Sequence, residues 1–155
     1  SHFGIVVFSL FLVVIFASFL RDHFREAPDS EAMNRVVEEL YTGPEALEWL
    51  KSNKNPSALA SNRFGPTADA TEFVQSLYDT GAEYVMISSS CIVDDSETLT
   101  DEGGPYADAI VVVIPHDRAK RKNLFDIIKK EIESEGFEFN PEDELYESKM
   151  FLWWD

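Results

Sequence analysis

An uninterrupted apolar run near the start of the chain constrains its organisation more than any other feature. Residues 3–20 read FGIVVFSLFLVVIFASFL and contain no charged side chain. As a helix this run would be about 27 Å long, at roughly 1.5 Å per residue, which nearly matches the hydrocarbon core of a bilayer. We therefore expect one transmembrane helix. A cleaved signal peptide is the alternative, although the run is longer than the usual apolar region and no A-x-A pattern precedes Arg21.

The residues that flank this run predict the side of the membrane on which the rest of the chain lies. Arg21 and Arg25 follow the run directly, whereas only His2 precedes it. Because positively charged flanks stay on the cytoplasmic side, we expect a single-pass membrane protein with a cytoplasmic domain. Residues 1–26 then form the anchor and its juxtamembrane segment.

Charge and cysteine content exclude several classes of protein. The formal net charge of −16 lies almost entirely after residue 25, so the folded part should repel nucleic acid and anionic lipid headgroups. The single cysteine, Cys91, excludes an internal disulfide framework and a multi-cysteine metal site. A chain of 155 residues leaves room for one ordinary domain besides the apolar run.

Hydrophobic periodicity after the run predicts a connecting segment at 27–57 and a domain at 58–155. Helices are expected at 31–41 and 44–51, and they would form a hairpin between anchor and domain. Gly43 separates the two helices, and the polar segment SNKNPS ends the second one.

The domain itself is expected to alternate strands and helices. In chain order these are a weakly patterned strand at 58–64, a helix at 67–80, strands at 83–93 and 107–114, a helix at 117–135 and a strand at 149–154. Thr67 and Asp117 are the predicted N-caps of the two helices, because their side-chain oxygens can accept backbone hydrogen bonds. The strands at 83–93 and 107–114 should form a hairpin.

This βαββαβ order resembles the ferredoxin-like fold, in which two helices cover one face of an antiparallel sheet of order 4-1-3-2. The resemblance covers residues 58–155 and implies an α+β architecture, but no activity, since the fold hosts unrelated functions. The stretches LYDTGA and PHDRAKRKNLF and the tryptophan-rich terminal strand are also similar to small bacterial proteins of unknown function. That second resemblance implies no function.

The chain lacks the spacing of a catalytic, cofactor or metal motif. Residues 94–102 supply oxygen ligands but not in the D-x-[DN]-x-[DN]-G order of a calcium loop, which favours a solvated hairpin loop. Cys91 and His116 would lie roughly 20 Å apart along the predicted hairpin, too far for a nucleophile and its base. We therefore predict no catalytic, cofactor or metal residues, with a concealed enzyme site as an alternative.

A cluster of cations is the first candidate contact site. Arg118, Arg121 and Lys122, together with Lys120, concentrate positive charge at the start of a helix, where the helix dipole disfavours it. Contact with an acidic group or phosphate is one explanation. Neutralisation by neighbouring carboxylates of this acidic chain is the other.

The terminal strand is the second candidate. Its sequence, KMFLWW, is apolar at odd and even positions, so both faces of the strand need cover. The helices predicted within 31–51 could cover the second face. Otherwise Phe151, Trp153 and Trp154 would form an exposed aromatic surface for a protein partner.

Together these features predict a membrane-anchored, non-enzymatic protein-binding or accessory subunit. Its expected partners are the membrane, through residues 3–20, and another protein or a second copy of the chain, but not nucleic acid. A ligand-sensing domain similar to ACT modules is the alternative. A pilin-like subunit also begins with an apolar helix, but the early glutamate of such helices is absent here.

Overall fold

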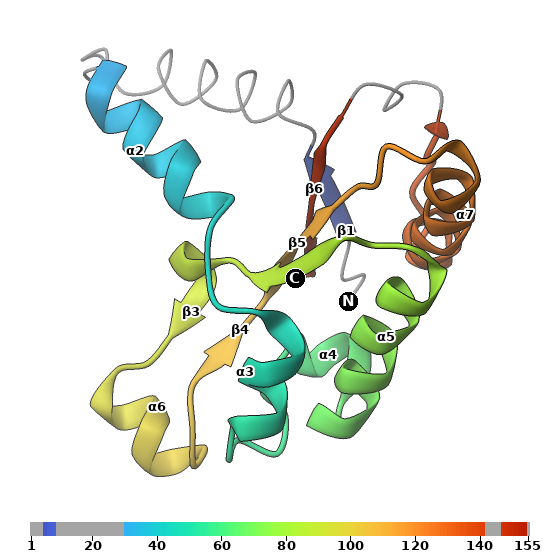
Figure 1. Ribbon diagram of the computed structural model, residues 1–155. Coiled ribbons are helices and arrows are strands. Elements are labelled where there is room, and N and C mark those ends of the chain that lie inside the picture. Colours follow the sequence, from blue (N-terminus) through green and yellow to red (C-terminus); the bar gives the residue numbers. More distant parts are fainter. Residues whose placement is uncertain (1–4, 9–29, 142–146, 155) are drawn as a thin grey trace.

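The computed structural model describes residues 5–8, 30–141 and 147–154. These residues form an α+β fold in which helices lie against both faces of an antiparallel sheet, with a smaller two-stranded sheet at one end (Figure 1). The α+β class predicted from the sequence is confirmed.

The main sheet contains, in spatial order, β1 (Ile5–Phe8), β6 (Lys149–Trp154), β5 (Ala109–Val113) and β2 (Tyr84–Ile87). All three strand pairs are antiparallel. The register places Val111 opposite both Met86 and Phe151, so these three side chains share one face. The predicted β2–β5 hairpin pairing and the terminal strand are therefore confirmed.

The strand predicted at 58–64 is wrong. Leu59 makes only an isolated parallel bridge to Ala107, and the chain then turns through Ala60, whose φ is +41°, into α4 (Ser61–Phe64). Small and polar residues in ALASN have little preference for a strand. As a result β6 pairs directly with β5, whereas the order 4-1-3-2 requires the first strand between them. The ferredoxin-like topology is not formed.

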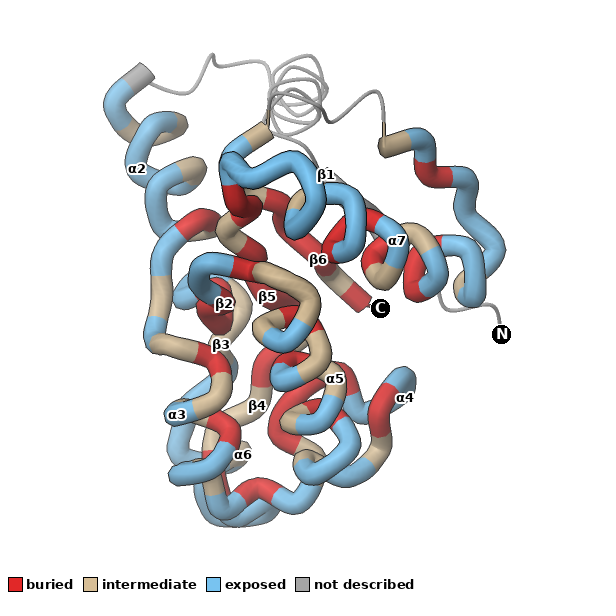
Figure 2. The backbone as a smooth tube through the Cα atoms, turned by 45° about the vertical axis from the view of Figure 1, so that its right-hand side comes forward, coloured by how far each residue is buried: buried red, intermediate tan, exposed pale blue. Residues whose placement is uncertain are grey.

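One face of the sheet is covered by α3 (Ala46–Ser52), α5 (Thr67–Thr80) and α7 (Arg118–Ser134). The larger core lies between these helices and the strands, and buried residues follow β5, β6 and the inner sides of α5 and α7 (Figure 2). Apolar residues at helical spacing explain this arrangement, because each helix presents one apolar stripe. All three helices lie where the periodicity predicted them.

The predicted helix caps differ in outcome. Asp117 caps α7 as expected, since its Oδ1 accepts from the Lys120 backbone N–H at 2.9 Å. Thr67 is instead the first residue of α5, and the preceding cap is Pro66. The Thr67 hydroxyl donates to the Asn55 carbonyl and accepts from an amide of the loop before α4, so it joins the helix start to that loop.

The other face of the sheet is covered by α2 (Ser30–Leu40). Tyr41, which follows it, is buried with Met86 and Phe151 in a second apolar cluster, against which Val37 and Leu40 also pack. The expectation that residues within 31–51 cover the second face of the terminal strand is confirmed. The segment predicted as a connector thus supplies side chains to the cores on both faces.

The strand predicted at 83–93 is interrupted. After β2 the buried hydroxyl of Ser88 donates to the Leu40 carbonyl at 2.8 Å, and a 3-10 turn follows. The chain then forms β3 (Ile92–Val93), which pairs with β4 (Tyr106–Ala107) in the two-stranded sheet. Between them, the acidic segment predicted as an open loop contains a short helix, α6 (Ser96–Asp101).

The predicted membrane helix falls mostly outside the described residues. Ile5–Phe8 forms β1 beside β6, so these four residues are extended rather than helical. Residues 9–29 are not among those that the structure describes. Within the described part of the chain, none of the helices combines the length and apolar character needed to cross a bilayer. The transmembrane helix stays a prediction.

Candidate functional site

The cation cluster predicted from the sequence lies on the first turns of α7. Four of the thirteen Lys and Arg residues of the chain fall within 118–122. Asp117 positions them, because its cap fixes where the helix begins. We call Arg118, Lys120, Arg121 and Lys122 the α7 cluster.

The structure brings the three predicted contact residues of this cluster together around one pocket of about 370 Å³. Its walls are Arg118, Arg121, Lys122, Phe125, Asp126, Asn140 and Pro141. Asn140 and Pro141 reach the pocket because the chain turns back after α7. In this turn Phe139 packs on Phe125, with 6.0 Å between the ring centroids, and the Phe139 carbonyl accepts a hydrogen bond from Lys129 Nζ. Pockets of this size can hold a small ligand or one chemical group of a larger one.

Arg121 forms the fixed part of the pocket. Its guanidinium lies over the Phe125 ring, with Cζ 5.0 Å from the ring centroid, and its Nη2 donates to the Glu147 carbonyl at 2.8 Å. These contacts tie the start of α7 to the approach of β6 while the positive charge stays beside the pocket. Arg121 therefore has a structural role whatever the pocket binds.

Neutralisation by a neighbouring carboxylate accounts for Lys122. Lys122 pairs with Asp126 at 2.9 Å one helical turn away, and both side chains are well exposed. Among the described residues, neither Arg118 nor Lys120 has a carboxylate within ion-pair distance. Within the described part of the chain, two exposed cations therefore have no ion-pair partner, in a protein whose net charge is −16.

The aromatic residues of β6 are placed differently from the exposed surface considered for them. Trp154 is 4% exposed and lies in the larger core, where its ring meets Phe64 edge-on at 5.2 Å. Phe151 is 5% exposed on the opposite face and packs on Tyr41. Trp153 is half-buried against the second cluster. Phe151 and Trp154 are therefore core residues and do not contribute to an exposed surface.

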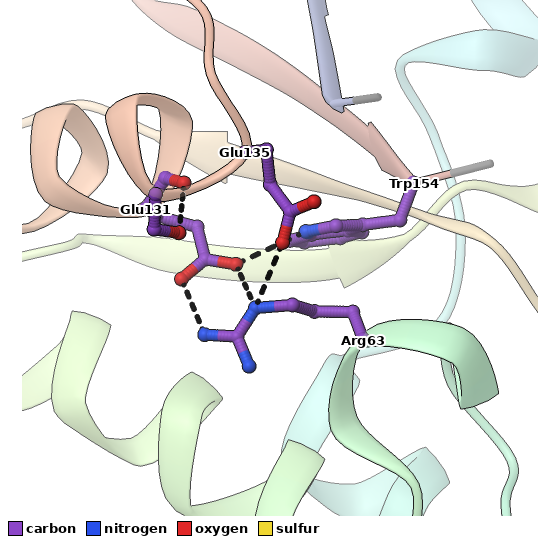
Figure 3. Close-up of polar contacts among 5 residues, drawn as sticks. Arg63, Glu131, Glu135 and Trp154 are labelled. Carbon is purple, nitrogen blue, oxygen red and sulfur yellow. Dashed lines mark hydrogen bonds and ion pairs between the residues drawn. The ribbon is translucent and has the colours of Figure 1, made fainter. Parts of the chain in front are cut away.

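A buried ion pair below the sheet was not identified from the sequence (Figure 3). Glu131 of α7 is 6% exposed and receives two hydrogen bonds from Arg63 of α4, at 2.6 and 2.8 Å. Trp154 Nε1 donates to the same carboxylate at 3.2 Å. The bond to Glu131 raises the pKa of the Arg63 guanidinium. Because each oxygen of Glu131 has a donor, the group holds α4, α7 and β6 together rather than acting as a base.

A second polar group closes the open edge of β2. The Tyr78 hydroxyl accepts from the Val85 backbone N–H at 2.9 Å and donates to Glu45 at 2.6 Å. Glu45 also caps α3 by accepting from two backbone amides. Burial tends to raise the pKa of Glu45, but these hydrogen bonds outweigh it and the pKa is lowered. Burial and the bond to Glu45 raise the pKa of Tyr78 to about 12.

Tyr106 has a similar environment. The raised pKa values of the two tyrosines predict that the fold loses stability at alkaline pH. Burial and a hydrogen bond to Asp108 raise the pKa of Tyr106 to about 12. An unfolded tyrosine has a pKa of about 10, so each neutral phenol stabilises the fold below that pH and this contribution is lost as pH rises towards the folded value. We expect the free energy of unfolding, measured with urea, to fall steeply between about pH 10 and 12.

The matched variant is Tyr78→Phe/Tyr106→Phe. It lacks both ionisations, so its stability should depend less on pH over the same interval, although it starts lower because the hydrogen bonds are lost. Parallel curves for the two proteins would contradict this explanation.

Other residues considered for chemistry are separated or already engaged. Cys91 follows β2 at the Ile87–Ile110 end of the β2–β5 pair, whereas His116 lies beyond the Tyr84–Val113 end. In the acidic segment, Asp95 caps α6, and hydrogen bonds from Thr98 and Glu97 lower its pKa. The described residues contain no group of three His, Cys, Asp or Glu side chains placed to hold a metal ion.

Neither a family model nor a curated protein nor a solved structure was found to match the chain.

Proposed function

We propose that this chain is a membrane-attached binding or accessory subunit. Residues 3–20 attach it to the bilayer, and its domain contacts a partner protein or a second copy beside the membrane. The observation that supports the proposal is the packing of α2, the first helix that the structure describes after the apolar run, directly on the sheet. Such packing suits a domain held at a fixed place near the bilayer.

Several contacts fix α2 to the sheet. Val37, Leu40 and Tyr41 pack on the face that contains Met86 and Phe151. The Ser88 hydroxyl donates to the carbonyl of Leu40, the last residue of the helix. The domain therefore follows the orientation of α2 instead of moving on a flexible linker.

The proposal requires a choice between two uses of Ile5–Phe8. With these residues in β1, the apolar run that remains, 9–20, would be about 18 Å long as a helix, which is short of a bilayer core of about 30 Å. A helix that spans the bilayer needs residues 5–8 as well. These residues would then leave the sheet, and β6 would have no strand on its β1 side. An unpaired strand edge offers backbone donors and acceptors to a strand of another chain. We infer that the freed edge of β6 is where the partner binds.

Membrane extraction and crosslinking test this function. We expect the full chain to stay with native membranes after an alkaline carbonate wash and, in mild detergent, to run in a particle much heavier than its own 17.6 kDa. Val14→Asp places a charge in the apolar run and should release the chain from the membrane.

The crosslinked control uses Val6→Cys/Trp153→Cys in a Cys91→Ser chain, because Val6 and Trp153 are partners in the β1–β6 register. Oxidation holds β1 in the sheet, so it should prevent both membrane retention and the heavy particle, and reduction should restore them. A wild-type chain that is washed off, or that travels as a monomer, would overturn the proposal.

Ligand sensing is the second candidate, and the pocket beside Arg118 and Arg121 favours it. Its likeness to ACT modules depended on a strand order that the sheet does not have. What remains is a site for a small anion. Binding of inorganic phosphate or a small carboxylate by the full chain in detergent would distinguish this function from the first.

A further inference from the structure

Charge is distributed unevenly between the two ends of the domain. In both views α6 lies at one end, and the starts of α2 and α7 lie toward the other (Figures 1 and 2). The α6 end carries five carboxylates within residues 94–102, while the α7 cluster places four cations within residues 118–122. Cations are therefore concentrated at the α7 end, where Asp79, Glu83, Asp117 and Asp126 also lie.

The chain enters the domain at the end that carries the α7 cluster (Figure 1). Residues 21–29 separate the apolar run from α2, and they include Arg21 and Arg25. Nine residues extend at most about 30 Å, so the start of α2 cannot lie further than this from the membrane surface. Because α2 is packed on the sheet, a tether of this length allows the end of the domain that carries the α7 cluster to reach the bilayer.

From this placement we propose that the α7 cluster binds the phosphate groups of anionic lipid headgroups and so orients the domain on the membrane. The inference rests on the proposed membrane attachment. Arg118 and Lys120 are exposed and have no carboxylate within ion-pair distance among the described residues. Beside them lies the pocket, to which Phe125 and Pro141 give an apolar wall.

The net charge of −16 acts on this contact through the carboxylates that lie close to the α7 cluster. A strand of six residues, such as β6, is about 20 Å long, and β4 and α6 lie beyond the sheet. Charges are screened over about 8 Å at physiological ionic strength, so the carboxylates at the α6 end have little effect on the contact. Asp79, Glu83 and Asp117 line a pocket with Lys120, and Asp126 pairs with Lys122, so these nearer carboxylates reduce the attraction that the cluster exerts.

Fluorescence quenching at the membrane surface tests the proposal with the full chain. In a Cys91→Ser background, Ala119→Cys places an environment-sensitive label within the cluster, and Leu99→Cys places one on α6. The protein is reconstituted in vesicles of phosphatidylcholine, with or without phosphatidylserine, that contain a headgroup-attached nitroxide quencher. We expect quenching at position 119 to rise several-fold with phosphatidylserine and to fall at high salt, and position 99 to stay unquenched.

Charge variants assign the effect to the cluster. Arg118→Gln/Lys120→Gln should remove most of the rise in quenching that phosphatidylserine causes at position 119, because the loss of each cation weakens the contact about fivefold. Lys51→Gln/Lys54→Gln removes the same charge near α3, at the α6 end, and should leave the quenching unchanged.

Three outcomes would overturn the inference. Equal quenching in both kinds of vesicle, or none while the chain remains bound, would reject the headgroup contact and leave the proposed function standing. Loss of quenching on adding inorganic phosphate, but not chloride of equal ionic strength, would assign the cluster to a free anion. A chain that fails to co-sediment with either vesicle would reject the membrane attachment itself, and this inference with it.

Discussion

Arg63→Met should lower the free energy of unfolding by roughly 3 kcal/mol, because it leaves Glu131 buried without its cation. This loss of free energy lies at the lower end of the range for a buried ion pair, because the Arg63 side chain is 34% exposed. Methionine keeps much of the apolar stem, but it also removes the guanidinium that lies over the Phe64 ring with its Cζ 4.9 Å from the centroid, so the loss includes this contact. Urea unfolding at neutral pH measures it.

A double-mutant cycle separates the ion pair from the packing. Glu131→Gln removes the negative charge but keeps an acceptor for Trp154 Nε1. The double variant Arg63→Met/Glu131→Gln should therefore be more stable, by about 1 kcal/mol or more, than the sum of the two single losses of unfolding free energy predicts. Lys122→Met breaks an exposed pair of the same type and should cost about 0.5 kcal/mol at most. Additive losses in the cycle would show that Arg63 and Glu131 are not coupled.

This ion pair shows what the sequence could have revealed about α7. Its apolar stripe was read correctly from Leu124, Ile128 and Ile132, and the helix is where the spacing placed it. Glu131 stands in the same stripe, seven residues after Leu124, so a charge on the buried face was visible. Its partner was not, because Arg63 was assigned to a strand and is 68 residues away in the chain.

The errors in the sheet have a common physical cause. Strands are defined by their neighbours, and a short segment such as 58–64 carries too little periodicity to show that it will make one bridge and then turn. Residues 5–8 were read as part of a helix because a continuous apolar run fits a membrane helix and a buried strand equally well. Only the pairing with β6 distinguishes the two.

The candidate site was predicted in part. Charge density alone singled out Arg118, Arg121 and Lys122, and the structure places them around one pocket. The pocket itself depends on Asn140 and Pro141, which no local pattern connects with the start of α7. Burial of Phe151 and Trp154 was equally unpredictable in detail, since it depends on which element covers each face of β6.

Gly43→Ala should be the most destabilising alanine substitution among the described glycines, at about 3 kcal/mol or more. A Cβ at this position would lie 1.7 Å from the Ile87 carbonyl oxygen. Gly43 is predicted from the sequence to end a helix, a position that often needs a positive φ, but its φ is not positive. A glycine is needed here because its lack of a Cβ lets the chain pass close to the Ile87 carbonyl. Without that space residues 42–44 must move away from β2, and Ile87 N–H and Ser89 N–H lose the carbonyls they donate to.

Gly65→Ala is the matched control. Gly65 has a φ of +66° and open space around its Cβ position, so alanine there should cost about 1 kcal/mol from backbone strain alone. Amide hydrogen exchange adds the location: protection at Ile87 and Ser89 should fall in Gly43→Ala and persist in Gly65→Ala. Equal losses of stability, or unchanged protection at Ile87, would mean that residues 42–44 do not close the edge of β2. In that case β2, rather than β6, would offer the free strand edge to a partner.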